Sequence, residues 1–249
     1  MMAASAKPRA LVFGHSFVRR FGEFIENCQP NGLYRRDLQL FHTCEVEIFG
    51  TGGRTVDKTI RFDLDAIRSF APDVVVLEMG SNDACEQDSD AETIASFLVA
   101  LTELLISECK LQIIVVCHIL PRKHPPFEEY NDRVRQINAL VSEALQHIKR
   151  AKSWRHRGLI YPSAEIYLAD GIHLNEGGNR ALYKSYRGAI LFALSQSRTY
   201  LSLHWYILMY IFLGEFLVPP LCNFVWVFCQ GCVWIKVNLE RLHCNTYLL

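Results

Sequence analysis

The stretch Asp73-Val-Val-Val-Leu-Glu-Met-Gly80 decides the fold of this 249-residue chain. Its run of apolar residues, three of them β-branched, predicts a strand buried on both faces, because an exposed face would interrupt the run with polar side chains. The stretch Gln112-Ile-Ile-Val-Val-Cys-His-Ile119 has the same character. Strands of this kind are typical of a parallel sheet with helices packed on each side.

Shorter strands and amphipathic helices alternate around these two stretches. We expect further strands at Arg9–Gly14, Cys44–Gly50 and Leu159–Tyr161, which makes five in all. The expected helices follow the 3.6-residue spacing of apolar side chains. They cover residues 17–28, 62–70, 91–109, 128–152 and 176–195. The alternation predicts an α/β fold, a three-layer sandwich around a parallel five-stranded sheet.

Composition divides the chain into three parts: an N-terminal arm over 1–8, an α/β domain over 9–195 and an apolar tail over 196–249. Within the tail, residues 200–218 are just long enough to cross a bilayer. Three interpretations of the tail stay open: an extension foreign to the protein, a membrane anchor, and a segment that packs on the domain or a partner. The first nine residues lack the apolar segment of a secretory signal, so we expect a cytoplasmic domain, with or without a membrane anchor.

Charge and cysteine content exclude several classes of protein. Lysine and arginine total 26, and aspartate and glutamate total 26, so the net charge is zero. Nucleic acid is therefore not an expected partner, because its phosphates attract a basic surface. The nine cysteines show no metal-type spacing except Cys229-Gln-Gly-Cys232, and a zinc site of this type needs a second such pair. We expect thiols in a reducing compartment, and no metal or cofactor.

Chemically useful residues directly follow three predicted strands. Ser16 follows the first strand and opens a helix, Gly52 and Gly53 follow the second, and Asn82 follows the third. Taken singly, these residues are explained as a helix N-cap, a tight turn and an Asx-turn. In a doubly wound sheet, however, these strand ends lie side by side. Together they would place a hydroxyl nucleophile beside N–H donors that can stabilise an oxyanion.

The stretch Asp170-Gly-Ile-His173 offers a general base. An aspartate and a histidine three residues apart on one loop can hydrogen-bond, which leaves the other imidazole nitrogen free to face Ser16. The plain alternative is a polar loop before a helix. Residues 50–55 lack the third glycine of G-x-G-x-x-G and the Gly-Lys-Ser/Thr of a phosphate loop, which weakens the case for a flavodoxin-like nucleotide binder.

Four blocks of the sequence, in order, resemble those of the SGNH hydrolases, the GDSL-like esterase and lipase superfamily. The blocks are Leu11–Ser16, Gly52–Thr55, Gly80–Asp83 and Asp170–His173. The resemblance extends over about residues 9–195, the extent of the alternating strands and helices. It implies a flavodoxin-like fold and metal-free hydrolysis of small carboxylic esters, acetyl esters included, through an acyl-enzyme intermediate.

The resemblance also implies a role for each site residue. Ser16 would be the nucleophile, His173 the general base and Asp170 the residue that orients it. The oxyanion hole would combine the backbone N–H groups of Ser16 and Gly53 with the side-chain amide of Asn82. The family usually has aspartate before the nucleophile, where this chain has His15. We expect the His15 side chain to point away from Ser16, because neighbouring side chains at a strand end point to opposite faces.

A non-catalytic alternative remains. The segment Gly14–Arg20 also resembles the start of esterase-like domains in retroelement-derived proteins, which suggests a binding or scaffold module with the same fold. The complete set of Ser16, Asp170, His173 and Asn82 favours an enzyme, because a scaffold would not need all four.

Overall fold

The computed structural model describes residues 7–28, 32–159, 164–217, 224–229 and 233–238, with side chains described up to residue 197. The chain forms two compact units, Met1–Arg198 and Thr199–Leu249.

The first unit is built on a parallel five-stranded sheet. Its strands are β1 (Arg9–Gly14), β2 (Glu45–Gly50), β3 (Val74–Glu78), β4 (Ile113–Cys117) and β5 (Ala151–Trp154). Their order is β2-β1-β3-β4-β5, and every neighbouring pair is parallel. This is the strand order of flavodoxin-like folds, so the predicted fold class is confirmed.

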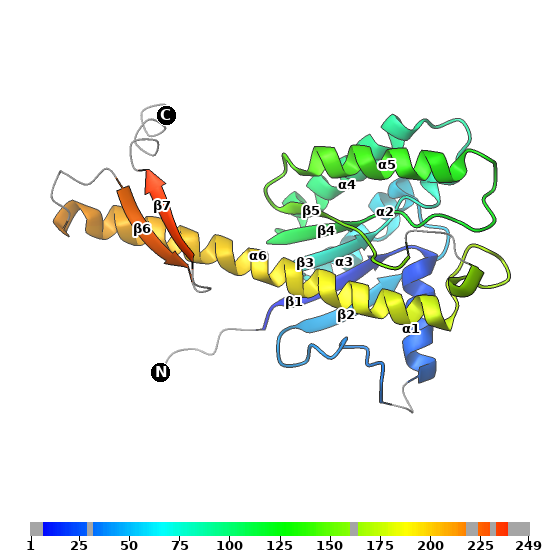
Figure 1. Ribbon diagram of the computed structural model, residues 1–249, viewed down its shortest axis with the longest axis horizontal. Helices are drawn as coiled ribbons and strands as arrows, with labels where there is room; N and C mark the ends of the chain where they lie inside the picture. The colour runs from blue at the N-terminus through cyan, green and yellow to red at the C-terminus, as the bar shows by residue number, and fades with distance from the viewer. Residues whose placement is uncertain (1–6, 29–31, 160–163, 218–223, 230–232, 239–249) are drawn as a thin grey trace. The chain divides into compact units, whose positions relative to one another are not determined.

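Helices cover both faces of the sheet (Figure 1). The helices are α1 (Ser16–Cys28), α2 (Val56–Phe62), α3 (Leu64–Phe70), α4 (Ala91–Glu108), α5 (Tyr130–Leu145) and α6 (Glu176–Leu217), with short 3₁₀ turns η2 (Asp83–Cys85) and η3 (Ala164–Ile166). Successive residues of β1 pack against opposite outer layers of helices. Val12 belongs to the apolar cluster that includes α1 and α6, and Phe13 to the cluster that includes α3, α4 and α5. The sheet is therefore the middle layer of a sandwich.

The sequence prediction is wrong at the β5 edge of the sheet. The helix expected to reach Lys152 ends at Leu145, and Ala151–Trp154 forms β5. Leu159, expected to open the fifth strand, is buried but lies in no strand, and residues 160–161 lie outside the described part. Strand β5 has only four residues and pairs on one side alone, so its sequence lacks the apolar run that marks β3 and β4.

Two helix boundaries also differ from expectation. The helix expected at 62–70 begins at Leu64, and the separate helix α2 precedes it. Asp63 lies between the two helices and interrupts the helical run. Its buried carboxylate accepts two hydrogen bonds, of 2.7 and 2.9 Å, from the Arg54 side chain. The last helix, expected to end at residue 195, continues to Leu217.

In the second unit, β6 (Phe224–Cys229) pairs antiparallel with β7 (Val233–Asn238). Over the described residues, no helix combines the length and the apolar character needed to cross a bilayer. The side chains of the predicted anchor at 200–218, and those of Cys229 and Cys232, lie outside the described part of the chain. The interpretations of the tail therefore stay predictions.

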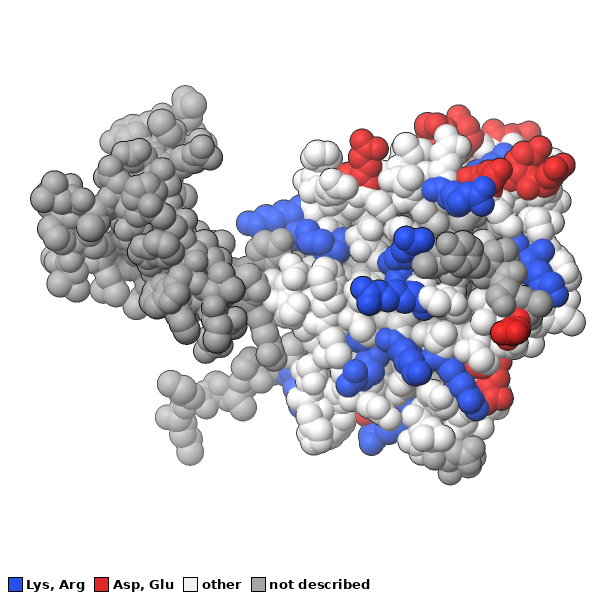
Figure 2. Space-filling model, in the orientation of Figure 1, with Lys and Arg blue, Asp and Glu red and all other residues white. Residues whose placement is uncertain are grey.

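The two signs of charge are unevenly spread on the surface, although the net charge is zero. Figure 2 shows several lysine and arginine side chains gathered in the middle of one face, whereas most of the acidic side chains on that face lie at its upper edge. A local excess of positive charge attracts anions, whatever the net charge of the whole chain.

Candidate active site

The carboxyl ends of β1, β2 and β3 lie level with one another. Gly14 pairs with Gly50 on β2 and with Glu78 on β3. A Cβ atom on Gly14 would lie 2.3 Å from the Glu78 carbonyl oxygen, and one on Gly50 would lie 2.3 Å from the Arg19 backbone nitrogen. Only glycine permits such a close approach of backbones. The residues that follow these strands therefore emerge together at one edge of the sheet.

A serine, a histidine and a carboxylate meet at this edge. Ser16, the first residue of α1, has its Oγ 3.1 Å from His173 Nε2. The other ring nitrogen, Nδ1, lies 2.8 Å from Asp170 Oδ2. Both distances are within hydrogen-bond range. The structure thus brings together the three residues that the sequence predicts as nucleophile, base and orienting residue, although 157 positions separate Ser16 from His173.

The loop that carries Asp170 and His173 is closed by its own backbone. Leu168 N–H donates to the His173 carbonyl at 2.7 Å, and Gly171 N–H donates to the Leu168 carbonyl at 2.9 Å. Gly171 has a φ of +65°, a conformation that favours glycine. These contacts fix the distance between the aspartate and the histidine.

Asp170 is held in its charged form. Partial burial alone would raise its pKa. The hydrogen bond from the His173 side chain and those from the backbone N–H groups of His173 and Ile172 outweigh that effect and lower the pKa to about 2. At neutral pH, the imidazole of His173 therefore faces a full negative charge. Such a charge stabilises an imidazolium when the ring takes up a proton.

The three predicted oxyanion donors differ in their hydrogen bonds. Among the described residues, the backbone N–H groups of Ser16 and Gly53 have no acceptor. Gly53 has a φ of +70° in an exposed turn. The side-chain Nδ2 of Asn82 donates to the Arg54 carbonyl at 2.7 Å. One of its two N–H bonds is engaged there, and the second is left for another acceptor.

His15 lies apart from the hydrogen-bonded set, as expected. Its ring is buried and stacks edge-on against Phe17, while its Nδ1 accepts a hydrogen bond of 3.4 Å from the Phe17 N–H. Burial is the main cause that lowers the pKa of His15, to about 4. A neutral, enclosed imidazole without a bond to Ser16 is a poor candidate for the base.

A second histidine–carboxylate pair, which was not predicted from the sequence, lies in the core. His156 Nε2 lies 2.8 Å from Glu78 Oε2, and the Tyr186 hydroxyl donates to the same oxygen at 3.1 Å. Burial would raise the pKa of Glu78, but the charge and hydrogen bond of His156 outweigh it and lower that pKa. The signal was a glutamate within an apolar strand, because a buried carboxylate requires a partner.

This buried pair is also the place where a metal ion could be held. The ligand atoms of Glu78, Cys117 and His156 lie within 4.8 Å of one another. The second ring nitrogen of His156 bonds Ser185 Oγ at 2.8 Å. The hydrogen bonds to Glu78 satisfy its carboxylate without a metal ion, and burial raises the pKa of Cys117 well above its usual range, which disfavours a thiolate ligand.

Comparison with known proteins agrees with the geometry. The sequence model of the GDSL-like lipase/acylhydrolase family matches residues 12–181, more than half of the chain. No curated protein sequence matches the chain.

Solved structures with the same fold have low sequence identity to this chain. A psychrotrophic esterase from Pseudoalteromonas sp. is 13% identical, with a TM-score of 0.59, over 76% of this chain and 100% of its own. A GDSL-like lipase from Bacteroides thetaiotaomicron is 18% identical, with a TM-score of 0.54, over 78% and 92%. A mutant acetyl-xylooligosaccharide esterase from Geobacillus is 15% identical, with a TM-score of 0.56, over 74% and 94%. At these identities the likeness shows the fold.

Proposed function

The chain belongs to the GDSL-like lipase/acylhydrolase family, and from this membership we propose that it is a serine esterase that cleaves carboxylic esters through Ser16. The observation that carries the proposal is the position of His173 between Ser16 Oγ, at 3.1 Å, and the Asp170 carboxylate, at 2.8 Å. A base that contacts both a nucleophile and an orienting carboxylate is the arrangement that activates a hydroxyl group.

The first half of the proposed reaction forms an acyl-enzyme. His173 Nε2 takes the proton of Ser16 as Oγ attacks the ester carbonyl carbon. The negative charge that develops on the carbonyl oxygen is stabilised by the N–H groups of Ser16, Gly53 and Asn82. When the tetrahedral intermediate collapses, the alcohol leaves with the proton held on His173.

The second half releases the acid. A water molecule gives a proton to His173 and attacks the acyl carbon, and the resulting intermediate expels Ser16 Oγ, which recovers its proton. The ionised Asp170 stabilises the imidazolium in both halves, because its carboxylate contacts Nδ1 throughout. No metal or cofactor takes part in this proposal.

Short acyl groups, and acetyl in particular, are the proposed substrates. The support is indirect: structures with the same fold include an acetyl esterase, an acetyl xylan esterase and the acetyl-xylooligosaccharide esterase. Acetyl preference predicts a higher kcat/KM for p-nitrophenyl acetate than for the octanoate ester. A reversed ranking would reject the acetyl assignment and leave the esterase proposal in place.

The test of Ser16 is its replacement by alanine in the full-length chain. Ser16→Ala should lower kcat/KM for p-nitrophenyl acetate by about 10⁴ or more, because removal of a nucleophile leaves only binding and oxyanion stabilisation. Ser107→Ala is the matched control, because Ser107 is exposed on α4 and, among the described residues, its hydroxyl bonds only the Leu104 carbonyl. A fluorophosphonate probe should label the wild type and the control but not Ser16→Ala.

The alternative is a scaffold that keeps the fold without the reaction. A folded wild-type chain that neither hydrolyses p-nitrophenyl esters nor reacts with the fluorophosphonate would establish this alternative and reject the proposed esterase.

A further inference from the structure

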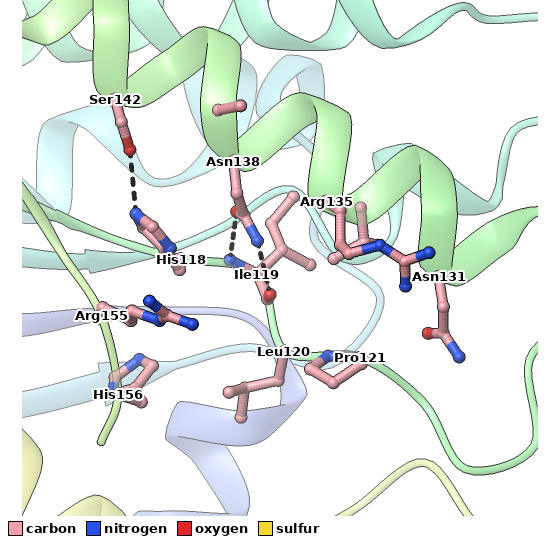
Figure 3. A pocket seen from close by; sticks show the side chains of 12 residues that line it. His118, Ile119, Leu120, Pro121, Asn131, Arg135, Asn138, Ser142, Arg155 and His156 are labelled. Carbon is pink, nitrogen blue, oxygen red and sulfur yellow. Dashed lines mark hydrogen bonds between the residues drawn. The ribbon is translucent and has the colours of Figure 1, made fainter. Parts of the chain in front are cut away.

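A cavity of about 420 Å³ opens beside the last two strands of the sheet, away from Ser16. Its walls are the segment His118–Pro121 after β4, one face of α5, and the pair Arg155–His156 after β5 (Figure 3). The volume is in the range of pockets that bind small molecules. Neither Ser16, Asp170 nor His173 lines it, so the cavity is distinct from the proposed catalytic centre.

The segment His118–Pro121 is held rigidly by two asparagines of α5. Asn138 accepts a hydrogen bond from Ile119 N–H at 2.8 Å and donates to the Ile119 carbonyl at 3.0 Å. Asn131 makes the same pair of bonds, each 2.8 Å, to the backbone of Arg122. These amides are therefore committed to the protein backbone, and the cavity is preformed.

The cavity walls are mainly apolar. Pro121 and Ala139 supply accessible aliphatic surface, whereas Ile119, Leu120 and Val134 line the cavity but are almost wholly buried. The polar wall residues, apart from the arginines, are paired within the protein: Ser142 Oγ lies 2.9 Å from His118 Nε2, and His156 uses both ring nitrogens, on Glu78 and Ser185. A ligand with an aliphatic body therefore fits these walls better than a sugar or another polyol.

The charges in the cavity are positive. Its lining contains Arg135 and Arg155 but no aspartate or glutamate. Arg135 forms an ion pair with Asp132, whereas Arg155 has neither an ion pair nor a hydrogen bond to any described residue. Figure 3 shows the Arg155 guanidinium group between His118 and His156. Burial is the main cause that lowers the pKa of His118, so Arg155 is the unpaired positive charge over the apolar walls.

We propose that this cavity binds an aliphatic monocarboxylate, with the carboxylate on Arg155 and the hydrocarbon chain against the accessible apolar side chains of Pro121 and Ala139. A guanidinium group matches a carboxylate through two parallel N–H donors, and the apolar walls remove the chain from water. An acid of this class is also the product of an ester hydrolysis, but its binding to this cavity does not require that reaction.

The chain segment that follows the cavity wall is hydrogen-bonded to the loop that carries Asp170 and His173. Lys123 and His124, just after the His118–Pro121 segment, donate their backbone N–H groups to the Gly171 carbonyl at 2.8 and 3.1 Å. A bound acid would therefore lie one loop away from Asp170 and His173 without touching either residue.

The test is isothermal titration of the full-length chain with sodium octanoate at neutral pH. The wild type should bind octanoate, and Arg155→Gln should weaken the affinity by about tenfold or more, because a charge-assisted hydrogen bond is lost. Arg157→Gln is the matched control: Arg157 is exposed, lies two residues away and does not line the cavity. The control should retain wild-type affinity.

Two further variants and one further ligand, octan-1-ol, separate this site from the catalytic centre and from unspecific apolar binding. Ser16→Ala should bind octanoate as the wild type does, whether or not the chain is an esterase. Ala139→Leu, which enlarges an exposed residue of the helical wall, should block binding with little cost to a helix that tolerates leucine well. The proposal is overturned if octanoate does not bind, if Arg155→Gln binds it unchanged, or if octan-1-ol binds equally well.

Discussion

Two histidine–carboxylate pairs in this molecule have the same contact distance and opposite surroundings. Asp170 and His173 lie 2.8 Å apart at the edge of the sheet, with 39% and 18% of their side chains exposed. Glu78 and His156 also lie 2.8 Å apart, but their side chains are 1% and 0% exposed. The second ring nitrogen of His173, Nε2, faces Ser16 Oγ, whereas the second ring nitrogen of His156, Nδ1, bonds Ser185 Oγ.

Under the proposed function, the difference indicates that a histidine–carboxylate pair alone does not make a catalytic base. A base must reach a nucleophile and a substrate, and it must change its protonation state at low cost. His173 meets the first condition through Ser16. His156 is enclosed in the core, and its two ring nitrogens are occupied by Glu78 and Ser185, so it reaches neither a nucleophile nor a substrate. We therefore assign chemistry to the exposed pair and stability to the buried pair.

The largest expected effect comes from His173→Gln. Under the proposed function, this change should lower kcat/KM for p-nitrophenyl acetate by about 10⁴, because it removes the ring proposed to take the Ser16 proton. The midpoint of thermal unfolding should change little, because His173 is partly exposed. The measurements are steady-state kinetics and a melting curve. Retention of wild-type activity would mean that another group is the base.

The same substitution at the buried pair should lower stability and leave activity nearly unchanged. His156→Gln should lower the free energy of unfolding by about 3–5 kcal/mol, because the buried Glu78 carboxylate loses the imidazole that it contacts at 2.8 Å. Activity of the folded fraction should stay within a few-fold of wild type. Urea titration and kinetics on the same sample would check both statements. A loss of activity without a loss of stability would contradict the assignment.

A third histidine, His15, tests how the core responds to pH. Its pKa is lowered to about 4 in the folded chain, and it is about 6.5 in an unfolded one. Between pH 4 and pH 6.5 the unfolded state binds more protons at His15 than the folded state does. The contribution of His15 to the free energy of unfolding is therefore fully present above pH 6.5 and is lost as the pH falls towards 4. The loss is about 3 kcal/mol.

His15→Asn should therefore reduce the difference between the unfolding free energies measured in urea at pH 7 and at pH 4.5. The contributions of other titrating groups, Asp170 among them, are common to both proteins and cancel in the comparison. An equal difference in the variant and the wild type would show that His15 is accessible to protons in the folded state.

The smallest effect is expected from Tyr186→Phe. The change removes one hydrogen bond, of 3.1 Å, to the Glu78 carboxylate while His156 stays in place. The free energy of unfolding should fall by about 1.5–3 kcal/mol. Tyr183→Phe is the matched control on the same helix, because within the described part of the chain the Tyr183 hydroxyl forms hydrogen bonds only with the backbone of Arg35. A larger loss of unfolding free energy in Tyr183→Phe than in Tyr186→Phe would contradict this prediction.

The exposed pair could be predicted from the sequence, and the buried pair could not. The carboxyl ends of parallel strands meet at one edge, so the order of the strands predicts that Ser16, Gly53 and Asn82 lie close together. Asp170 and His173 are three residues apart, which is a local signal. Glu78 and His156 are 78 residues apart, and His156 lies between two arginines, as an exposed histidine would.

The edge of the sheet escaped prediction for a similar reason. Residues 146–152 continue the apolar spacing of α5, and nothing in Ala151–Trp154 outweighs it locally. The strand forms because it pairs with β4, and that pairing is set by the whole sheet rather than by the four residues themselves.

The separation of 157 positions between Ser16 and His173 has a consequence for biosynthesis. At about 5–20 residues per second, roughly 8–30 s pass on the ribosome between the synthesis of Ser16 and that of His173. During that time the nascent chain carries the hydroxyl without the imidazole, and α6, which covers one face of β1, has not been made. Under the proposed function, the growing chain therefore carries no complete catalytic site until all five strands of its sheet have been translated.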